Sequence, residues 1–97
     1  MRSSDKKLNP SLKKEINNTL AQTLADIKSV DEAKTFINDF FTSTELETFS
    51  KRLAVAYWLK KGRSYENIKE NLKVSSATIA DVSASMNKTG IKAAVNV

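Results

Sequence analysis

The sequence predicts a small all-α domain, a multi-helix bundle with a helix-turn-helix at its C-terminal end. Three observations support this fold class. The chain has 97 residues, which suits one domain. It contains only two glycines and one proline, whereas an all-β chain needs turn residues at regular intervals. Its apolar residues recur every three or four positions, which is the spacing of an amphipathic helix.

The composition excludes several classes of function. The chain has no cysteine and no histidine, which removes disulfide frameworks, Cys/His metal sites and Ser-His-Asp triads. Glu66 and Glu70 lie one helical turn apart, but Lys69 and Lys73 make them a solvated charged face. There is no glycine-rich phosphate loop. We therefore expect no enzyme, no cofactor and no metal.

No run of apolar residues is long enough to span a membrane, and the N-terminus lacks the apolar core of a signal peptide. We expect a cytoplasmic protein. Its charge is uneven: residues 1–50 carry seven basic and eight acidic side chains, whereas residues 51–97 carry nine basic and three acidic ones. A basic C-terminal half favours a polyanionic partner, nucleic acid before membrane. The alternative is a solvated basic face.

Residues 1–9 are polar and predict a disordered N-terminal arm, and residues 10–90 predict the helical domain. Asn9 is a candidate N-cap, with Pro10 at the first helical position. A single narrow apolar stripe follows, which is typical of a helix that contacts one partner helix. The alternative is an ordinary intramolecular core. The stripe consists of Leu12, Ile16, Leu20, Leu24 and Ile27.

Two further helices follow. Ser29 and Glu32 have the spacing of a capping box that opens a short aromatic helix. Thr44 and Glu47 have the same spacing and predict the start of a central helix with apolar residues around most of its circumference. Lys60, Lys61 and Gly62 follow, which suits a helix C-terminus with glycine in the left-handed conformation.

Residues 64–88 predict a helix-turn-helix. Five apolar residues have the offsets that two helices crossing at a wide angle need: Ile68, Leu72, Val74, Ile79 and Val82. Two positions depart from the usual pattern. Lys69 stands where a small residue is usual, and Lys73 stands where a glycine with positive φ is usual, at a cost of about 1 kcal/mol.

The second helix of this motif, from Ser76 to about Met86, is the predicted DNA-reading helix. Short side chains at its start allow the backbone to approach a groove, and they contact phosphates or thymine methyl groups. The candidates are Ser75, Ser76, Ala77 and Thr78, with Lys60, Lys61, Arg63, Lys69 and Lys73 as phosphate contacts. Alternatively, the two serines only cap the helix, and Lys60 and Lys61 only complement a helix dipole.

The segment LKVSSATI (residues 72–79), the helix of residues 46–59 that carries Lys51-Arg52-Leu53, and Gly62 together resemble the Trp repressor family. The likeness covers roughly residues 20–88, and Ala77-Thr78-Ile79 is among its most specific parts. It implies an all-helical, intertwined homodimer whose two reading heads enter successive major grooves of double-stranded DNA.

The resemblance also implies a tryptophan pocket framed by two arginines. Arg52 matches the first, but Asp81 stands in place of the second, and Val82 replaces the glycine after it. We therefore expect no tryptophan binding, and Arg52 is free to pair with a carboxylate such as Asp81. The family's C-terminal helix is missing or vestigial, so that residues 91–97 are expected to be a tail.

These observations together predict a repressor-like transcription regulator that binds DNA as a homodimer without tryptophan as corepressor. The alternative is a helical protein-interaction module that has lost DNA binding, which Asp81 and the absence of arginine from the reading helix favour.

Overall fold

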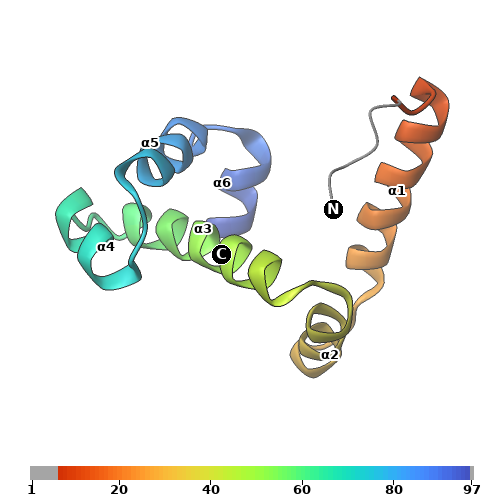
Figure 1. The fold of residues 1–97 in the computed structure, drawn as a ribbon, viewed down its shortest axis with the longest axis horizontal. Helices are drawn as coiled ribbons and strands as arrows, with labels where there is room; N and C mark the ends of the chain where they lie inside the picture. Colours follow the sequence, from red (N-terminus) through yellow and green to blue (C-terminus); the bar gives the residue numbers. More distant parts are fainter. Residues whose placement is uncertain (1–6, 97) are drawn as a thin grey trace. The chain divides into compact units, whose positions relative to one another are not determined.

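The computed structural model describes residues 7–96, which form six α-helices and no strand (Figure 1). They divide into two compact units, one up to Asp39 and one from Phe40 onward. The all-α fold class is thereby confirmed. The helices are α1 (Pro10–Asp26), α2 (Val30–Phe40), α3 (Ser43–Lys60), α4 (Tyr65–Leu72), α5 (Ser76–Ser85) and α6 (Thr89–Val95). None of these helices has the length and apolar character needed to cross a membrane.

In the first unit, α1 begins as expected. The Asn9 side chain accepts hydrogen bonds from the backbone N–H groups of Ser11, at 2.8 Å, and Leu12, at 3.4 Å. Pro10 occupies the first turn, where no intrahelical donor is needed. Most of the predicted N-terminal arm, residues 1–6, lies outside the described residues.

The start of α2 is also fixed by the predicted pair. The Ser29 Oγ accepts from the Glu32 N–H at 3.1 Å, and the Glu32 carboxylate accepts from the Lys28 N–H at 3.2 Å. In a capping box the carboxylate is expected to accept from the N–H of the N-cap, Ser29. Here it accepts from the N–H of the preceding residue, Lys28.

The apolar stripe of α1 is exposed. Leu12, Ile16, Leu20 and Leu24 each expose between 43% and 50% of their surface, and no residue of α1 or α2 is buried. The first unit therefore presents an apolar face instead of a core of its own.

In the second unit, α3 begins two residues before the start indicated by Thr44. The capping box forms between Thr42 and Glu45: the Glu45 N–H donates to Thr42 Oγ1 at 3.1 Å, and the Thr42 N–H donates to Glu45 Oε1 at 2.9 Å. The predicted box at Thr44 and Glu47 is wrong. Both pairs have the same spacing, but the earlier one lengthens the helix by two residues and adds the bond from the Leu46 N–H to the Thr42 carbonyl.

The end of α3 follows the sequence prediction. Gly62 has φ of 83°, in the left-handed region. The Arg63 N–H donates to the Trp58 carbonyl at 3.2 Å, and the Gly62 N–H donates to the Leu59 carbonyl at 3.0 Å. These two bonds are those of a Schellman motif, which closes the helix and turns the chain toward α4.

The core lies where α4, α5 and α6 pack on α3 (Figure 1). Val55, Ile68 and Ile79 are almost completely buried at its centre. The remaining buried residues are Ala56, Val82 and Val95. Because α4, α5 and α6 all pack on α3, the orientation of α5, the helix predicted to read DNA, is fixed within the second unit.

Residues 91–95 of the expected C-terminal tail instead belong to α6, and Val97 lies outside the described residues. Val95 is 4% exposed, and Ile91 packs against the core. The C-terminal end of α6 is held by α3: Tyr57 Oη donates to the Ala94 carbonyl at 3.2 Å, and Lys60 Nζ donates to the Val95 carbonyl at 3.0 Å and to the Asn96 side chain. A helix this short is stable because of these tertiary contacts rather than its own propensity.

We predict that Thr42→Ala lowers the free energy of unfolding by about 1 kcal/mol, because it removes the acceptor for the Glu45 N–H. Thr44→Ala is the matched control and is expected to change it by less than about 0.5 kcal/mol. Chemical denaturation of the two variants measures both values. Equal effects would show that the capping box does not form at Thr42.

Candidate nucleic-acid interface

The helices α4 and α5 are joined by a three-residue turn, residues 73–75. Ser64 caps α4 by accepting from the Asn67 N–H at 3.1 Å. Ile68 on α4 and Ile79 on α5 are buried, and Leu72 and Val74 pack against the same core. The five apolar residues singled out from their spacing therefore lie together in the structure.

Lys73 adopts the left-handed conformation expected from its place in the turn, with φ of 55° and ψ of 48°. It has the only positive φ at a non-glycine residue in the described part of the chain. Its carbonyl accepts a long hydrogen bond, 3.5 Å, from Lys51 Nζ on α3, and the same ammonium lies 3.4 Å from the Glu47 carboxylate. Lys51 therefore ties the turn to the central helix.

The start of α5 is capped and open to solvent. The Thr78 N–H donates to Ser75 Oγ at 3.1 Å, and the two hydroxyl oxygens lie 3.0 Å apart. Ser75, Ser76 and Ala77 are exposed, and Thr78 is half-buried. No acidic residue lies in the first turn, so the positive end of this helix dipole faces solvent without a neutralising carboxylate.

A groove of about 240 Å³ adjoins this helix start and is bordered by α3 and the turn. Lys51, Arg52 and Lys73 supply three cations to its lining, and Glu47 is the one acid there. Sequence reasoning did not assign Lys51 to this region, because its approach to the turn joins positions 22 residues apart. The helical spacing gives no signal for such a contact.

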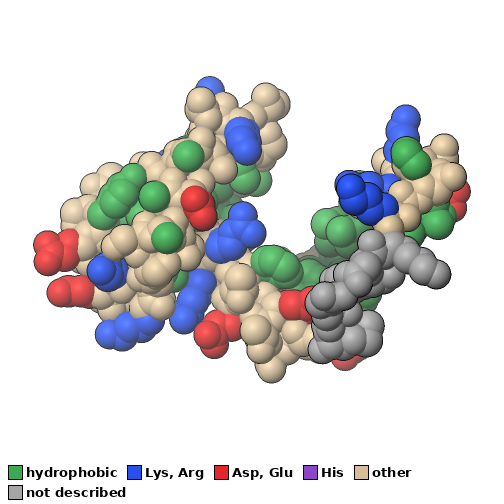
Figure 2. Space-filling view, turned by 45° about the horizontal axis from the view of Figure 1, so that its top comes forward, with side chains coloured by type: hydrophobic (Ala, Val, Ile, Leu, Met, Phe, Trp, Pro, Cys, Tyr) green, Lys and Arg blue, Asp and Glu red, His purple; other side chains and the backbone are tan. Residues whose placement is uncertain are grey.

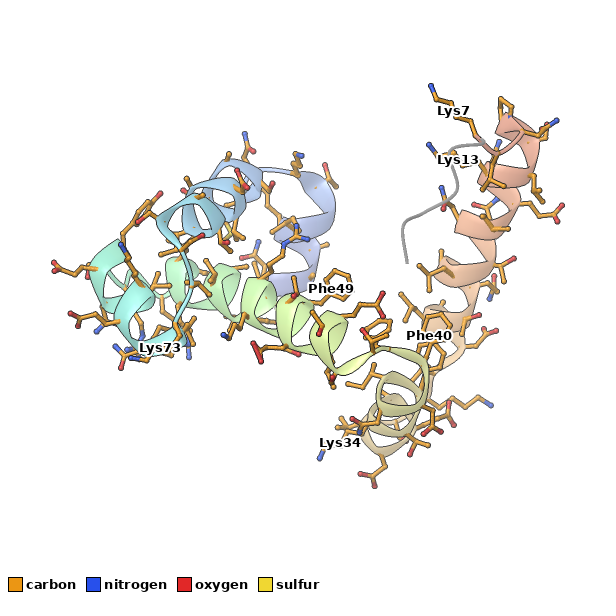
Figure 3. The ribbon with its side chains drawn as sticks, in the orientation of Figure 1. Lys7, Lys13, Lys34, Phe40, Phe49 and Lys73 are labelled. Carbon is orange, nitrogen blue, oxygen red and sulfur yellow. The ribbon has the colours of Figure 1, made fainter. Side chains whose placement is uncertain are left out.

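Of the five predicted phosphate-contact cations, three have no acidic partner in the described part of the chain and two are engaged within it. Lys61, Lys69 and Lys73 are exposed, and no acidic partner is found for their side chains among residues 7–96. Figure 2 shows lysine and arginine side chains on the surface of the second unit, and Figure 3 labels Lys73. Arg63 lies over the Trp58 ring, 4.5 Å from its centroid, in a cation–π contact. Lys60 instead holds the end of α6.

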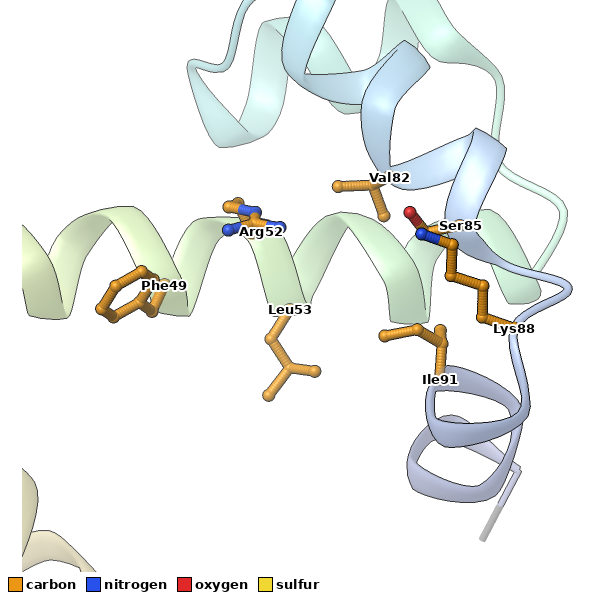
Figure 4. Close-up of a pocket in the computed structure, with 7 residues that line it drawn as sticks. All are labelled: Phe49, Arg52, Leu53, Val82, Ser85, Lys88 and Ile91. Atoms are coloured by element: carbon orange, nitrogen blue, oxygen red, sulfur yellow. The ribbon is translucent and has the colours of Figure 1, made fainter. Parts of the chain in front are cut away.

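A second pocket, of about 390 Å³, lies between α3, α5 and α6 (Figure 4). Its lining combines apolar side chains with two cations and one hydroxyl: Phe49, Arg52, Leu53, Val82, Ser85, Lys88 and Ile91. Asp81 is exposed and is not among these residues. The described residues form no ion pair between Arg52 and Asp81, so the structure does not contain the pairing that the sequence analysis considered.

Lys60 and Lys61 provide a test of these placements. We predict that Lys60→Met lowers the free energy of unfolding by about 1 kcal/mol, because the carbonyl of Val95 loses its charged donor. Lys61→Met is the control: its side chain is exposed, and we expect a change below about 0.5 kcal/mol. Thermal or urea unfolding measures both. Equal losses would contradict the assignment of Lys60 to α6.

Comparison with known proteins agrees with this architecture. The Trp repressor protein family matches residues 15–94 of the chain. The chain is 31% identical over 68 residues to a Bacillus subtilis (strain 168) protein named "Uncharacterized protein YerC"; the match covers 70% of this chain and 65% of that protein. A crystal structure of a TrpR-like protein from Eubacterium eligens ATCC 27750 superposes with a TM-score of 0.79 at 33% identity, covering 91% of this chain and 93% of that one. The chain belongs to the Trp repressor protein family.

Proposed function

We propose that this chain is a repressor-like, DNA-binding transcription regulator that acts as a homodimer. In this proposal α4 and α5 form a helix-turn-helix, and α5 of each protomer enters the major groove as the reading helix. The observation that carries this proposal is the free leading edge of α5. Ser76 and Ala77 are exposed at its start, and the opposite face is buried through Ile79 and Val82. The membership of a family named for a repressor supports the same function.

The side chains at this edge suit close approach to DNA. They are short, so that the helix backbone reaches the floor of the groove, and Ala77 offers a methyl group for contact with a thymine methyl. Ser75 and Thr78 are engaged in the cap. Each hydroxyl keeps lone pairs, and the exposed Ser75 Oγ lies where a phosphate near the helix N-terminus is favoured.

The proposed phosphate contacts are the exposed cations of the helix-turn-helix and of the segment before it: Lys61, Arg63, Lys69 and Lys73. They lie before α4, on α4 and in the turn, so they flank the reading helix instead of occupying it. Such contacts position a protein on DNA and supply most of its affinity. We leave Lys60 out of this set because its ammonium is occupied at α6.

A second copy of the chain is the proposed partner for the exposed apolar surfaces. Besides the α1 stripe, α3 exposes Phe49, Leu53 and Tyr57, which lie at four-residue intervals along one face. Phe49 is shown on this helix in Figure 3. A homodimer that covers these faces also presents two α5 helices, which suits half-sites one helical turn apart.

Tryptophan does not suit the pocket beside α5 as a corepressor. The Val82 side chain, 8% exposed, occupies the lining where the family has a glycine. The second arginine that the resemblance implies is replaced by Asp81, which is exposed and lies outside the pocket lining, so no second arginine frames the amino acid. Arg52 alone remains of the two arginines.

Salt dependence tests the DNA-binding function. For the wild type we predict a steep linear fall of log K with log salt on duplex DNA, because each phosphate contact releases counterions. Lys69→Ala and Lys73→Ala are each expected to reduce the magnitude of the slope by about 0.9 per protomer. Fluorescence anisotropy with a labelled duplex measures these slopes.

Lys34→Ala is the control for that series, because Lys34 is an exposed lysine of the first unit, outside the proposed reading head. Its slope should equal that of the wild type. If log K of the wild type does not change with log salt, even at low salt, the proposal of DNA binding is wrong. The alternative, a protein-interaction module, is favoured by the acidic Asp81 on α5.

Added tryptophan provides a separate test. We predict that a large excess of L-tryptophan leaves both the melting temperature and the DNA affinity unchanged, since a ligand that does not bind the native state cannot stabilise it. Differential scanning fluorimetry and the same anisotropy assay measure the two quantities. A concentration-dependent rise in melting temperature would show that the pocket accepts tryptophan despite Val82 and the missing second arginine.

A further inference from the structure

Asp81 is the one charged residue of α5, and it lies on the exposed face of that helix. The exposed positions of α5 recur with helical spacing, and Ile79 and Val82 form the buried face opposite them. The exposed face consists of Ser76, Ala77, Ala80, Asp81 and Ala84. Asp81 is therefore directed to the same side as the leading edge proposed to meet DNA.

The stability of the protein does not account for an acid at this position. Asp81 lies in the middle of α5, where the helix dipole gives a carboxylate little stabilisation, and aspartate is a poor helix former in a helix interior. Among residues 7–96 its carboxylate has neither an ion pair nor a hydrogen bond; only its backbone carbonyl accepts from Ser85 Oγ, at 3.2 Å. An acid facing DNA also repels phosphates.

The neighbours of Asp81 make it the side chain that reaches furthest from this face. Ala77 and Ala84 flank it at helical spacing, Ala80 directly precedes it, and each extends only one carbon from the backbone. When alanines bring the helix close to the base edges, the Asp81 carboxylate is the first group to meet a donor or acceptor on a base.

The major groove offers a carboxylate one well-suited partner. Cytosine presents the N4 amino donor, guanine presents only the acceptors N7 and O6, and thymine presents the O4 acceptor and a methyl group. Adenine has a donor at N6, but its N7 acceptor lies beside it and repels a carboxylate. We propose that Asp81 determines base specificity by accepting a hydrogen bond from cytosine N4. This inference rests on the proposed DNA-binding function.

Selection of bound duplexes from a random pool tests the inference with the wild type, Asp81→Asn and Asp81→Ala. The wild type should show one position in each half-site with a preference for C of about tenfold. Asn pairs with adenine N6 and N7, so Asp81→Asn should change that position from C to A. Asp81→Ala should lose the preference. Both variants remove the same charge, so their difference isolates base reading from repulsion.

Glu70→Gln is the matched control, because it removes one exposed carboxylate from α4 without changing the face of α5. It should retain the preference for C. The inference would be overturned if both Asp81 variants kept the base preferences of the wild type, or if they gained affinity uniformly for all sequences. Salt-dependent binding by the wild type would in that case still support the proposed function. Absence of duplex binding by the wild type would overturn both.

Discussion

The structure of the second unit depends on the burial of two isoleucines against one side of α3. Ile68 of α4 and Ile79 of α5 meet Val55, and each is at most 1% exposed. Burial of a side chain of this size contributes about 2 kcal/mol. Because both isoleucines are directed inward, the remaining faces of α4 and α5 are directed to solvent. The exposure of the leading edge of α5 is thus a consequence of the core.

Hydrogen bonds from side chains of α3 also hold the turn between α4 and α5 and the C-terminal end of α6. Lys51 donates to the carbonyl of Lys73 in the turn, and Tyr57 and Lys60 donate to the carbonyls of Ala94 and Val95 at the end of α6. All three bonds satisfy backbone acceptors that no helix satisfies. Part of the positive charge of residues 51–97 therefore has a structural function, and only the remainder is available to a polyanion.

Local signals in the sequence predicted most of the fold. Asn9 and Ser29 cap helices as expected, and Gly62 ends α3 in the left-handed conformation. The start of α3 was misplaced because Thr42 and Thr44 both precede a glutamate at capping distance. Two features arise from contacts between distant residues and leave no periodic signal: the helix α6, and the engagement of Lys60 with it. For the candidate site, the exposure of Ser76 and Ala77 was predicted, whereas the groove formed with Lys51 was not.

The first unit shows why the proposed assembly and the proposed DNA binding belong together. Neither α1 nor α2 contains a buried residue, yet Leu12 and Leu20 lie on a regular apolar face. Isolated helices of this length are marginal in water, and their stability in proteins comes from covering the apolar face. In the proposed homodimer, the second chain supplies that cover and at the same time a second α5. A single reading helix contacts few base pairs, so in this proposal the surface that stabilises the first unit also supplies the specificity that one protomer lacks.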